Sequence, residues 1–252
     1  MDLKVTTEIT FGENIREVIV PEKLREKIPT GLEYMDAALG GKGLTPSVIT
    51  LFTGTPGAGK TTMMLTLADC LSSMGCAVIY NTAEESAYQT KMTVDRLRLQ
   101  AGFGMGQEHD VQSLIEKFDT WSTTGDRKDK HPVLFVDSLQ TLKDSRWDTG
   151  RITSKTAEMA LEALTDYAKQ THCNIVVIGQ VNKSGKMAGS NKLKHMVDCH
   201  LELSVEVDDK SDYYMARKLF TSKNRFGGAG HLSFLRIHER GFDEIARIGN
   251  VV

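Results

Sequence analysis

The stretch VITLFTGTPGAGKTT, residues 48–62, joins an apolar run to a glycine-rich loop and then to a helical pattern. Residues 54–61 match G-x-x-x-x-G-K-[ST] at every required position. Glycines allow the backbone N–H groups of such a loop to turn toward phosphate oxygens, and the start of the helix adds partial positive charge. The stretch therefore predicts a strand, a loop and a helix that together bind a nucleoside triphosphate.

We expect the loop to surround the phosphates of ATP, with Mg²⁺ as the second cofactor. Lys60 is expected to bridge the β- and γ-phosphates and so to assist catalysis, and the Thr61 hydroxyl is expected to ligate the metal. The expected nucleotide-binding residues are Gly54, Thr55, Pro56, Gly57, Ala58, Gly59, Lys60, Thr61 and Thr62.

Three polar residues stand at or just after the ends of other apolar runs. VLFVD ends in Asp137, a carboxylate that we expect beside the phosphate loop as a second group for Mg²⁺. Glu84 follows AVIYN and is expected to activate the attacking water, whereas Glu85 also fits the N-terminus of the next helix. Gln180 ends NIVVIGQ and is expected to contact the γ-phosphate as a catalytic group.

Strand and helix patterns alternate through most of the chain. Nearly continuous apolar runs predict strands at 48–54, 77–81, 133–137 and 174–180, and helical spacing predicts helices at 61–74, 86–101, 111–118 and 153–170. Such alternation predicts an α/β fold, with a mostly parallel sheet and helices on both faces. Closely spaced strand-like segments after residue 199 predict antiparallel hairpins that extend this sheet.

The polar N-terminal segment differs from this pattern. We interpret residues 1–28 as an arm or linker that packs on a neighbour, with one short helical stretch at 21–27, and residues 29–252 as the ATPase domain. Residues 122–131 and 183–194 are expected to be loops.

Composition excludes several classes of protein. A net charge of −2 argues against a surface that binds polyanions as a whole, so any nucleic-acid site must be local. The four cysteines lack C-x-x-C spacing and are expected to be buried thiols in a reducing compartment. No apolar run approaches the roughly 20 residues that span a bilayer, and the charged N-terminus is no signal peptide. We therefore expect a cytoplasmic protein without a membrane partner.

Two basic stretches have no role in the phosphate loop itself. The lysine segment, VNKSGKMAGSNKLKHM at 181–196, contains no acidic residue. Its lysines, the candidate DNA contacts, are Lys183, Lys186, Lys192 and Lys194. From composition alone, a nucleotide-dependent grip on a polyanion and an ordinary solvated loop are equally compatible with it.

The second stretch is KNRFG at 223–227. Residues two apart on a strand point to one face, so Lys223 and Arg225 are expected to meet an anionic group together.

Taken in order, these segments resemble the RadA/Sms family of the RecA superfamily. The similar stretches are PTGLEYMDAALGGKGL (29–44), VIYNTAEES (78–86), VLFVDSLQTL (133–142), NKSGKMAGSNKLKHMVD (182–198) and KNRFG. The resemblance implies a RecA-like P-loop NTPase core. We note two differences inside the motifs: Ala83 stands where the family has glycine, and Lys194 where it has glutamate.

The resemblance also implies an activity. It implies a DNA-dependent ATPase and helicase that forms a homo-oligomeric, hexameric ring, moves on single-stranded DNA, and acts in branch migration during recombination and in DNA repair. Lys223 and Arg225 would then act in catalysis on ATP held by the next subunit.

The resemblance is confined to the ATPase core, because the family's four-cysteine zinc finger and Lon-like domain have no counterpart in these residues. A core of this size also resembles phage recombination ATPases, for which the host cytoplasm is the expected location.

Two other functions remain open at this point. One is a KaiC-like assembly or signalling ATPase that binds no DNA. The other is a recombinase that forms filaments in the manner of RecA.

Overall fold

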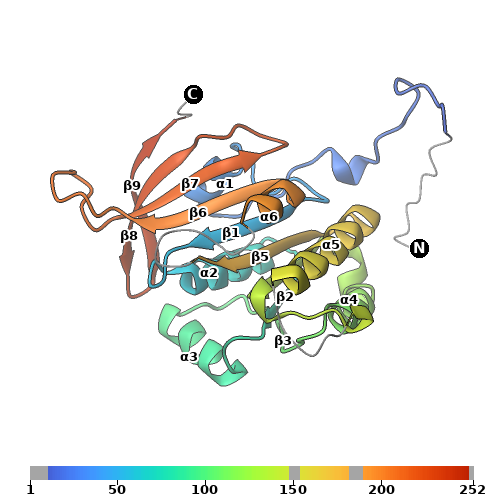
Figure 1. The fold of residues 1–252 in the computed structure, drawn as a ribbon, viewed down its shortest axis with the longest axis horizontal. Helices are drawn as coiled ribbons and strands as arrows, with labels where there is room; N and C mark the ends of the chain where they lie inside the picture. Colours follow the sequence, from blue (N-terminus) through green and yellow to red (C-terminus); the bar gives the residue numbers. More distant parts are fainter. Residues whose placement is uncertain (1–10, 148–153, 182–189, 250–252) are drawn as a thin grey trace.

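The computed structural model describes residues 11–147, 154–181 and 190–249. Within these ranges one sheet contains all of the named strands, in the order β3-β2-β4-β5-β1-β6-β7-β8-β9 (Figure 1). Their bounds are β1 Ile49–Gly54, β2 Ala77–Thr82, β3 Gly104–Gly106, β4 Pro132–Asp137, β5 Asn174–Gln180, β6 Cys199–Val205, β7 Arg217–Asn224, β8 Leu232–His238 and β9 Gly241–Ile248.

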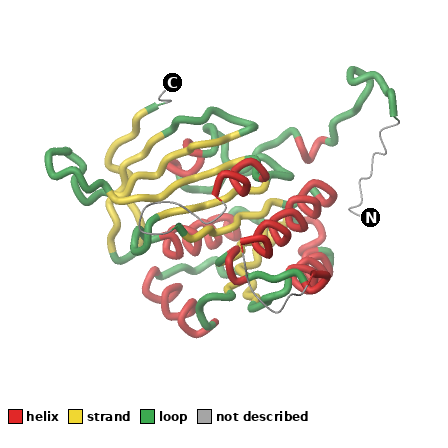
Figure 2. The backbone as a smooth tube through the Cα atoms, in the orientation of Figure 1, coloured by secondary structure: helices red, strands yellow, loops and turns green. Residues whose placement is uncertain are grey.

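Strands β3, β2, β4, β5, β1 and β6 run parallel, and β7, β8 and β9 follow as antiparallel neighbours. Figure 2 shows this sheet with helices packed against it. The helices are α1 Glu33–Ala38, α2 Lys60–Ser73, α3 Ala87–Leu97, α4 Val111–Ser122, α5 Ser154–Thr171 and α6 Ser190–Met196. The predicted α/β class and RecA-like architecture are confirmed.

Alternating strand residues supply two hydrophobic cores, one on each face of the sheet. On one face Phe52 of β1 and Phe135 of β4 pack with α1 and α2. On the other face Leu51 and Leu134, one position earlier, pack with α4, α5 and α6. Both faces of the central strands are therefore dry, which explains their nearly continuous apolar sequence.

Several elements differ from the prediction. β6 was expected to open the antiparallel region, but it pairs in parallel with β1, so the antiparallel part begins at β7. β3, β9 and α1 were not predicted. The C-terminal part of the predicted loop 183–194 belongs to α6, and the stretch predicted as helical at 21–27 forms only a 3₁₀ turn at Glu22–Leu24.

The N-terminal residues lie apart from the sheet. Ile28 and Leu44 exchange backbone hydrogen bonds of 2.8 Å, and the chain enters the core from there. Before this point the side chains of Phe11, Ile15 and Ile19 are exposed, and Figure 1 shows their segment extending away from the body of the molecule. Among the residues that the structure describes, no helix has the length and apolar character needed to cross a bilayer.

Candidate nucleotide-binding site

The phosphate loop connects β1 to α2 in a cradle that only glycine permits. A Cβ atom on Gly54 would lie 2.3 Å from the Leu203 carbonyl oxygen on β6. A Cβ on Gly59 would lie 2.8 Å from the Phe242 ring, and the Gly59 backbone has φ 102°. The first N–H groups of α2 have no acceptor within the helix. The cradle and its open donors fit a polyphosphate.

Lys60 lies back over this loop. Its ammonium donates hydrogen bonds to the carbonyl oxygens of Gly54, at 2.9 Å, and Thr55, at 3.3 Å. Burial lowers the pKa of Lys60, and the nearby negative charges of Asp137 and Glu84 partly oppose that shift. The loop therefore holds its lysine at the place where phosphate charge would be neutralised.

Asp137 ends β4 close to the start of α2. Its Oδ2 atom accepts hydrogen bonds from the hydroxyl of Tyr80, at 2.7 Å, and from that of Thr61, at 3.4 Å. Burial raises the pKa of Asp137, and the hydrogen bond from Tyr80 opposes this shift. Thr61 and Asp137 thus supply adjacent oxygen atoms, the ligand type that Mg²⁺ prefers.

Strand order explains how these groups meet. β5 lies between β1 and β4, so Asp137 is not on a strand next to the loop strand. It reaches Thr61 because the carboxyl ends of the parallel strands gather at one edge of the sheet. Tyr80 was not predicted as part of the site; its position in the buried run AVIYN, two residues before the end of β2, was the available signal.

Glu84 and Glu85 follow β2 at this same edge. Glu84 is exposed, and the Glu85 backbone exchanges hydrogen bonds with the Thr82 hydroxyl. Ser86 is the N-cap of α3 and forms a capping box with Gln89. Because Ser86 caps the helix, neither glutamate side chain is needed for that purpose.

Gln180 is exposed at the end of β5. Its backbone N–H donates to Gln140 Oε1 at 3.2 Å, and its carbonyl accepts from Gln140 Nε2 at 3.5 Å. Gln140, in the stretch VLFVDSLQTL, was not singled out from the sequence. It links the ends of β4 and β5 beside the nucleotide site.

The structure describes two of the four lysines in the lysine segment, Lys192 and Lys194. Lys183 and Lys186 lie outside the described residues. Lys192 forms an ion pair of 2.6 Å with Glu158 on α5, and Lys194 one of 3.1 Å with Glu202 on β6. Both described lysines therefore have carboxylate partners within the chain, which the local sequence did not reveal.

The two cations of KNRFG also have partners within the chain. The Lys223 ammonium donates to the carbonyl oxygens of Lys194, at 2.9 Å, and His195, at 3.2 Å, in the last turn of α6. Arg225 Nη1 lies 2.9 Å from Asp198 Oδ1. β7 ends at Asn224, so Arg225 stands in the following turn and the two-residue alternation predicted for the pair does not extend to it.

The KNRFG turn packs against a second stretch of the resemblance. A Cβ on Gly40 would lie 3.0 Å from the Gly227 Cα atom, so the two backbones approach closely. Lys27 donates a 3.3 Å hydrogen bond to the Phe226 carbonyl oxygen. The LGG and KNRFG stretches, distant in sequence, therefore form one contact.

KNRFG and the phosphate loop lie at opposite ends of the central strands. β6 pairs in register with β1, so that Cys199 faces Thr50 and Leu203 faces Gly54. Asn224 of β7 pairs with Cys199. Asn224 therefore lies beside Thr50, by way of Cys199. Thr50 is four residues, or about 13 Å along the strand, before Gly54. The cations of KNRFG point at the amino end of β1, and the nucleotide loop lies at its carboxyl end.

Comparison with known proteins identifies a matching family and several relatives. The family described as "ATPase: KaiC" matches residues 28–105. The DNA repair protein RadA of Mycobacterium tuberculosis is 34% identical over 226 residues, which are 88% of this chain and 44% of that protein. RadA of Haemophilus influenzae is 32% identical over 236 residues, or 92% and 47% of the two chains.

A solved structure shares the fold. The ATPase domain of G40P superposes with a TM-score of 0.75 at 14% identity, covering 89% of this chain and 93% of that one. This chain spans slightly less than half the length of the curated relatives that it matches. Its ATPase core has the RecA-like fold and is similar in sequence to the corresponding part of the RadA proteins.

Proposed function

We propose that this protein is an ATP hydrolase that assembles into a hexameric ring, holds ATP between subunits and moves on single-stranded DNA in recombination, branch migration and DNA repair. One observation carries the assembly: the phosphate loop and the KNRFG cations lie at opposite ends of the same strands. A single subunit therefore cannot bring Arg225 to its own nucleotide, whereas a head-to-tail neighbour can.

The proposed chemistry is the attack of water on the γ-phosphorus and cleavage of its bond to the bridging oxygen, which releases ADP and phosphate. Lys60 and the loop N–H groups bind the phosphates, and Thr61 and Asp137 would hold Mg²⁺, which supplies charge neutralisation when bound. Glu84, exposed at the same edge, orients and deprotonates the water. Gln180, exposed at the end of β5, contacts the γ-phosphate. Lys223 and Arg225 of the neighbouring subunit neutralise the charge that develops on the γ-phosphate, as an arginine finger does. These two cations are called the finger residues below.

The exposed N-terminal arm supports an assembly. Phe11, Ile15 and Ile19 are 105%, 81% and 76% exposed, and burial against another subunit would remove this apolar surface from water. We propose residues 1–28 as this intersubunit arm and residues 29–252 as the ATPase domain.

DNA is the proposed ligand of the lysine segment. Its phosphates would compete with Glu158 and Glu202 for Lys192 and Lys194. We place this activity in the cytoplasm, where thiols stay reduced, in keeping with the four free cysteines.

The test is steady-state ATP turnover across protein concentration, with and without single-stranded DNA. We expect turnover per subunit to rise with concentration and with DNA. Mixtures of Lys60→Ala and Arg225→Ala subunits, each inactive alone, should regain activity, because one supplies the finger and the other the intact loop. No recovery at any ratio would contradict a finger that acts on the neighbour.

A second candidate is an ATP-switched assembly protein without DNA binding. The match of residues 28–105 to the KaiC ATPase family favours it, as do the in-chain partners of Lys192 and Lys194. Turnover that rises with protein concentration but ignores DNA would select this alternative. A filament in place of a ring would be visible by negative-stain microscopy with a non-hydrolysable ATP analogue.

A further inference from the structure

A buried polar network crosses the sheet beside the phosphate loop. His200 on β6 is fully buried, and its Nε2 atom lies 2.8 Å from Thr53 Oγ1 on β1. Its Nδ1 atom is within hydrogen-bond distance of the Ser222 hydroxyl on β7. Buried polar atoms need such partners, so the three strands are tied together at this level.

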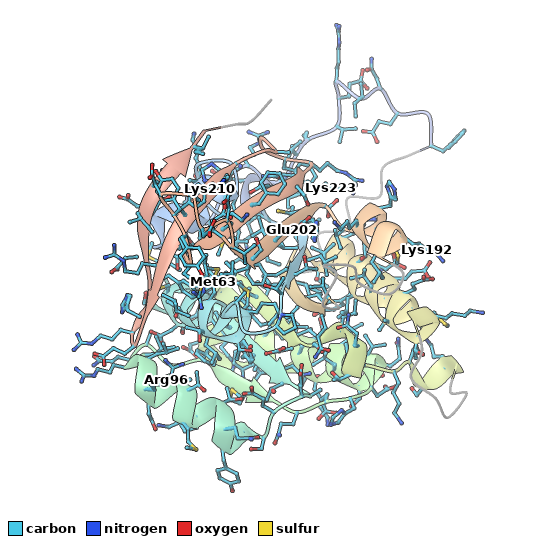
Figure 3. The ribbon with its side chains drawn as sticks, turned by 60° about the vertical axis from the view of Figure 1, so that its left-hand side comes forward. Met63, Arg96, Lys192, Glu202, Lys210 and Lys223 are labelled. Atoms are coloured by element: carbon cyan, nitrogen blue, oxygen red, sulfur yellow. The ribbon has the colours of Figure 1, made fainter. Side chains whose placement is uncertain are left out.

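The network continues outward to the lysine segment. Glu202 Oε1 lies 3.2 Å from His200 Nδ1 and 3.1 Å from the Lys194 ammonium on α6. Figure 3 labels Glu202 on β6 and Lys223 on the neighbouring strand. A continuous chain of polar contacts thus runs from Thr53 through His200 and Glu202 to Lys194.

The hydrogen-bond directions in this chain are fixed by charge. Burial lowers the pKa of His200 to about 4, so the imidazole is neutral near neutral pH. A neutral imidazole has one N–H donor and one acceptor nitrogen. With a carboxylate at Nδ1, the proton belongs on Nδ1, and Nε2 accepts from the Thr53 hydroxyl. The ion pair with Lys194 helps to keep the pKa of Glu202 below its usual value, against the effect of burial.

Each end of the polar network lies next to a group of the proposed mechanism. Thr53 directly precedes Gly54, whose carbonyl accepts the 2.9 Å hydrogen bond from Lys60. At the other end, the carbonyl of Lys194 accepts the 2.9 Å hydrogen bond from Lys223. The network therefore joins the phosphate loop to the helix that carries the described lysines and holds a finger residue.

We infer that His200 and Glu202 are positioning residues that couple Lys194 on α6 to the phosphate loop, so that DNA phosphate drawing Lys194 away from Glu202 alters the hydrogen bond at Thr53. The inference rests on the proposed function. Once Lys194 leaves, the partners that the Glu202 carboxylate keeps among the described residues are His200 and Ser222. The Nδ1 side of the imidazole then faces an uncompensated negative charge, and its Nε2 atom contacts Thr53, one residue from the loop.

Glu202→Gln tests this coupling, because the amide keeps the shape and removes the charge. The matched control is Glu206→Gln, which breaks the 3.2 Å ion pair between Glu206 and Lys218 just past the carboxyl end of β6. Neither Glu206 nor Lys218 belongs to the network of His200 and Glu202. Turnover is measured with and without saturating oligo-dT, and oligo-dT affinity is measured separately by fluorescence anisotropy. Thermal unfolding verifies that both variants are folded.

We expect Glu202→Gln to bind oligo-dT at least as well as the wild type, because Lys194 is released. Its stimulation of turnover by saturating oligo-dT should fall by about fivefold or more, a typical size for a coupling between sites. Glu206→Gln should keep the wild-type stimulation. In a cycle with Lys194→Met, the double variant should lose no more stimulation than Glu202→Gln alone.

Full stimulation in Glu202→Gln would overturn the coupling and leave the proposed function standing. Equal loss in Glu206→Gln would also overturn it, since the effect would then be a general consequence of removing charge from this sheet. A wild-type enzyme that hydrolyses ATP without binding oligo-dT would overturn the proposed DNA function and this inference together.

Discussion

The two ends of the central strands differ in how their cations are held. At the carboxyl end, the hydrogen bonds that Lys60 donates to described residues go to backbone carbonyls of its own loop, and burial lowers its pKa. At the amino end, Arg225 is paired with a buried carboxylate, Asp198. Lys60 can bind an anion without first releasing a carboxylate. Arg225 must leave Asp198 before it can bind another anion.

Under the proposed function, this contrast predicts which step of ATP hydrolysis depends on the assembly. Filling the phosphate loop requires little rearrangement, so nucleotide binding should depend on the single subunit. Presenting the finger requires the Asp198 ion pair to open, so hydrolysis should depend on the assembly. The four expectations below test this division, beginning with the largest effect.

Arg225→Ala should lower kcat by about a thousandfold, in the range found for arginine fingers, with little change in ATP affinity. The exposed Arg236→Ala on β8 is a suitable control and should retain activity. Turnover and equilibrium binding of a fluorescent ATP analogue measure the two quantities separately. Equal losses of binding and turnover would place Arg225 in the subunit's own nucleotide site.

Glu84→Gln should lower kcat by about a hundredfold, the lower part of the range for a general base. The neighbouring Glu85→Gln serves as control, because the structural contacts of Glu85 with Thr82 are made by its backbone. A larger loss of kcat in Glu85→Gln than in Glu84→Gln would show that Glu85, and not Glu84, activates the water.

His200 should make the fold sensitive to acid. Its folded pKa of about 4 lies below the value near 6.5 of an unfolded chain, so between these values the unfolded state binds the extra proton. Stability should therefore fall as pH drops from about 6.5 to about 4, with His200 contributing about 3 kcal/mol of that loss.

His200→Gln removes this titration, and its unfolding free energy should vary less with pH by that amount. Urea unfolding at a series of pH values measures the difference. The exposed His109→Gln is the control. Identical pH profiles for His200→Gln and the wild type would show that the imidazole is not held neutral by the fold.

The smallest effect concerns the ion pair between the exposed Lys192 and the half-buried Glu158. Glu158→Gln should strengthen oligo-dT binding by about twofold, since an ion pair with a solvent-exposed partner contributes little. Exchange of the exposed Glu116 for Gln on α4 is the control. Weaker binding in Glu158→Gln would indicate that the ion pair orients Lys192 toward DNA.

Local patterns predicted the parts of the fold that depend on neighbours in sequence. The apolar runs gave β1, β2, β4 and β5 almost to the residue, because strands buried on both faces have an unmistakable composition. β3 is only Gly104–Gly106, too short for a pattern. The parallel pairing of β6 with β1 depends on a crossover, and no local feature reveals it.

The candidate site divides in the same way. The glycine loop is a local motif, and its cradle could be foreseen. The partners of Asp137, Lys194 and Arg225 come from other elements: Tyr80 on β2, Glu202 on β6 and Asp198 at the end of α6. Such contacts are products of the sheet order, and a single sequence carries no direct record of them.

In the proposed assembly, the opposite placement of the phosphate loop and of Arg225 would give each subunit a head and a tail. In any open row of subunits, one terminal loop then has no finger and one terminal finger has no nucleotide. An open row of n subunits would contain n − 1 complete hydrolytic sites, whereas a closed ring of n would contain n. Counting active sites per subunit therefore measures closure itself, independently of any image of the assembly.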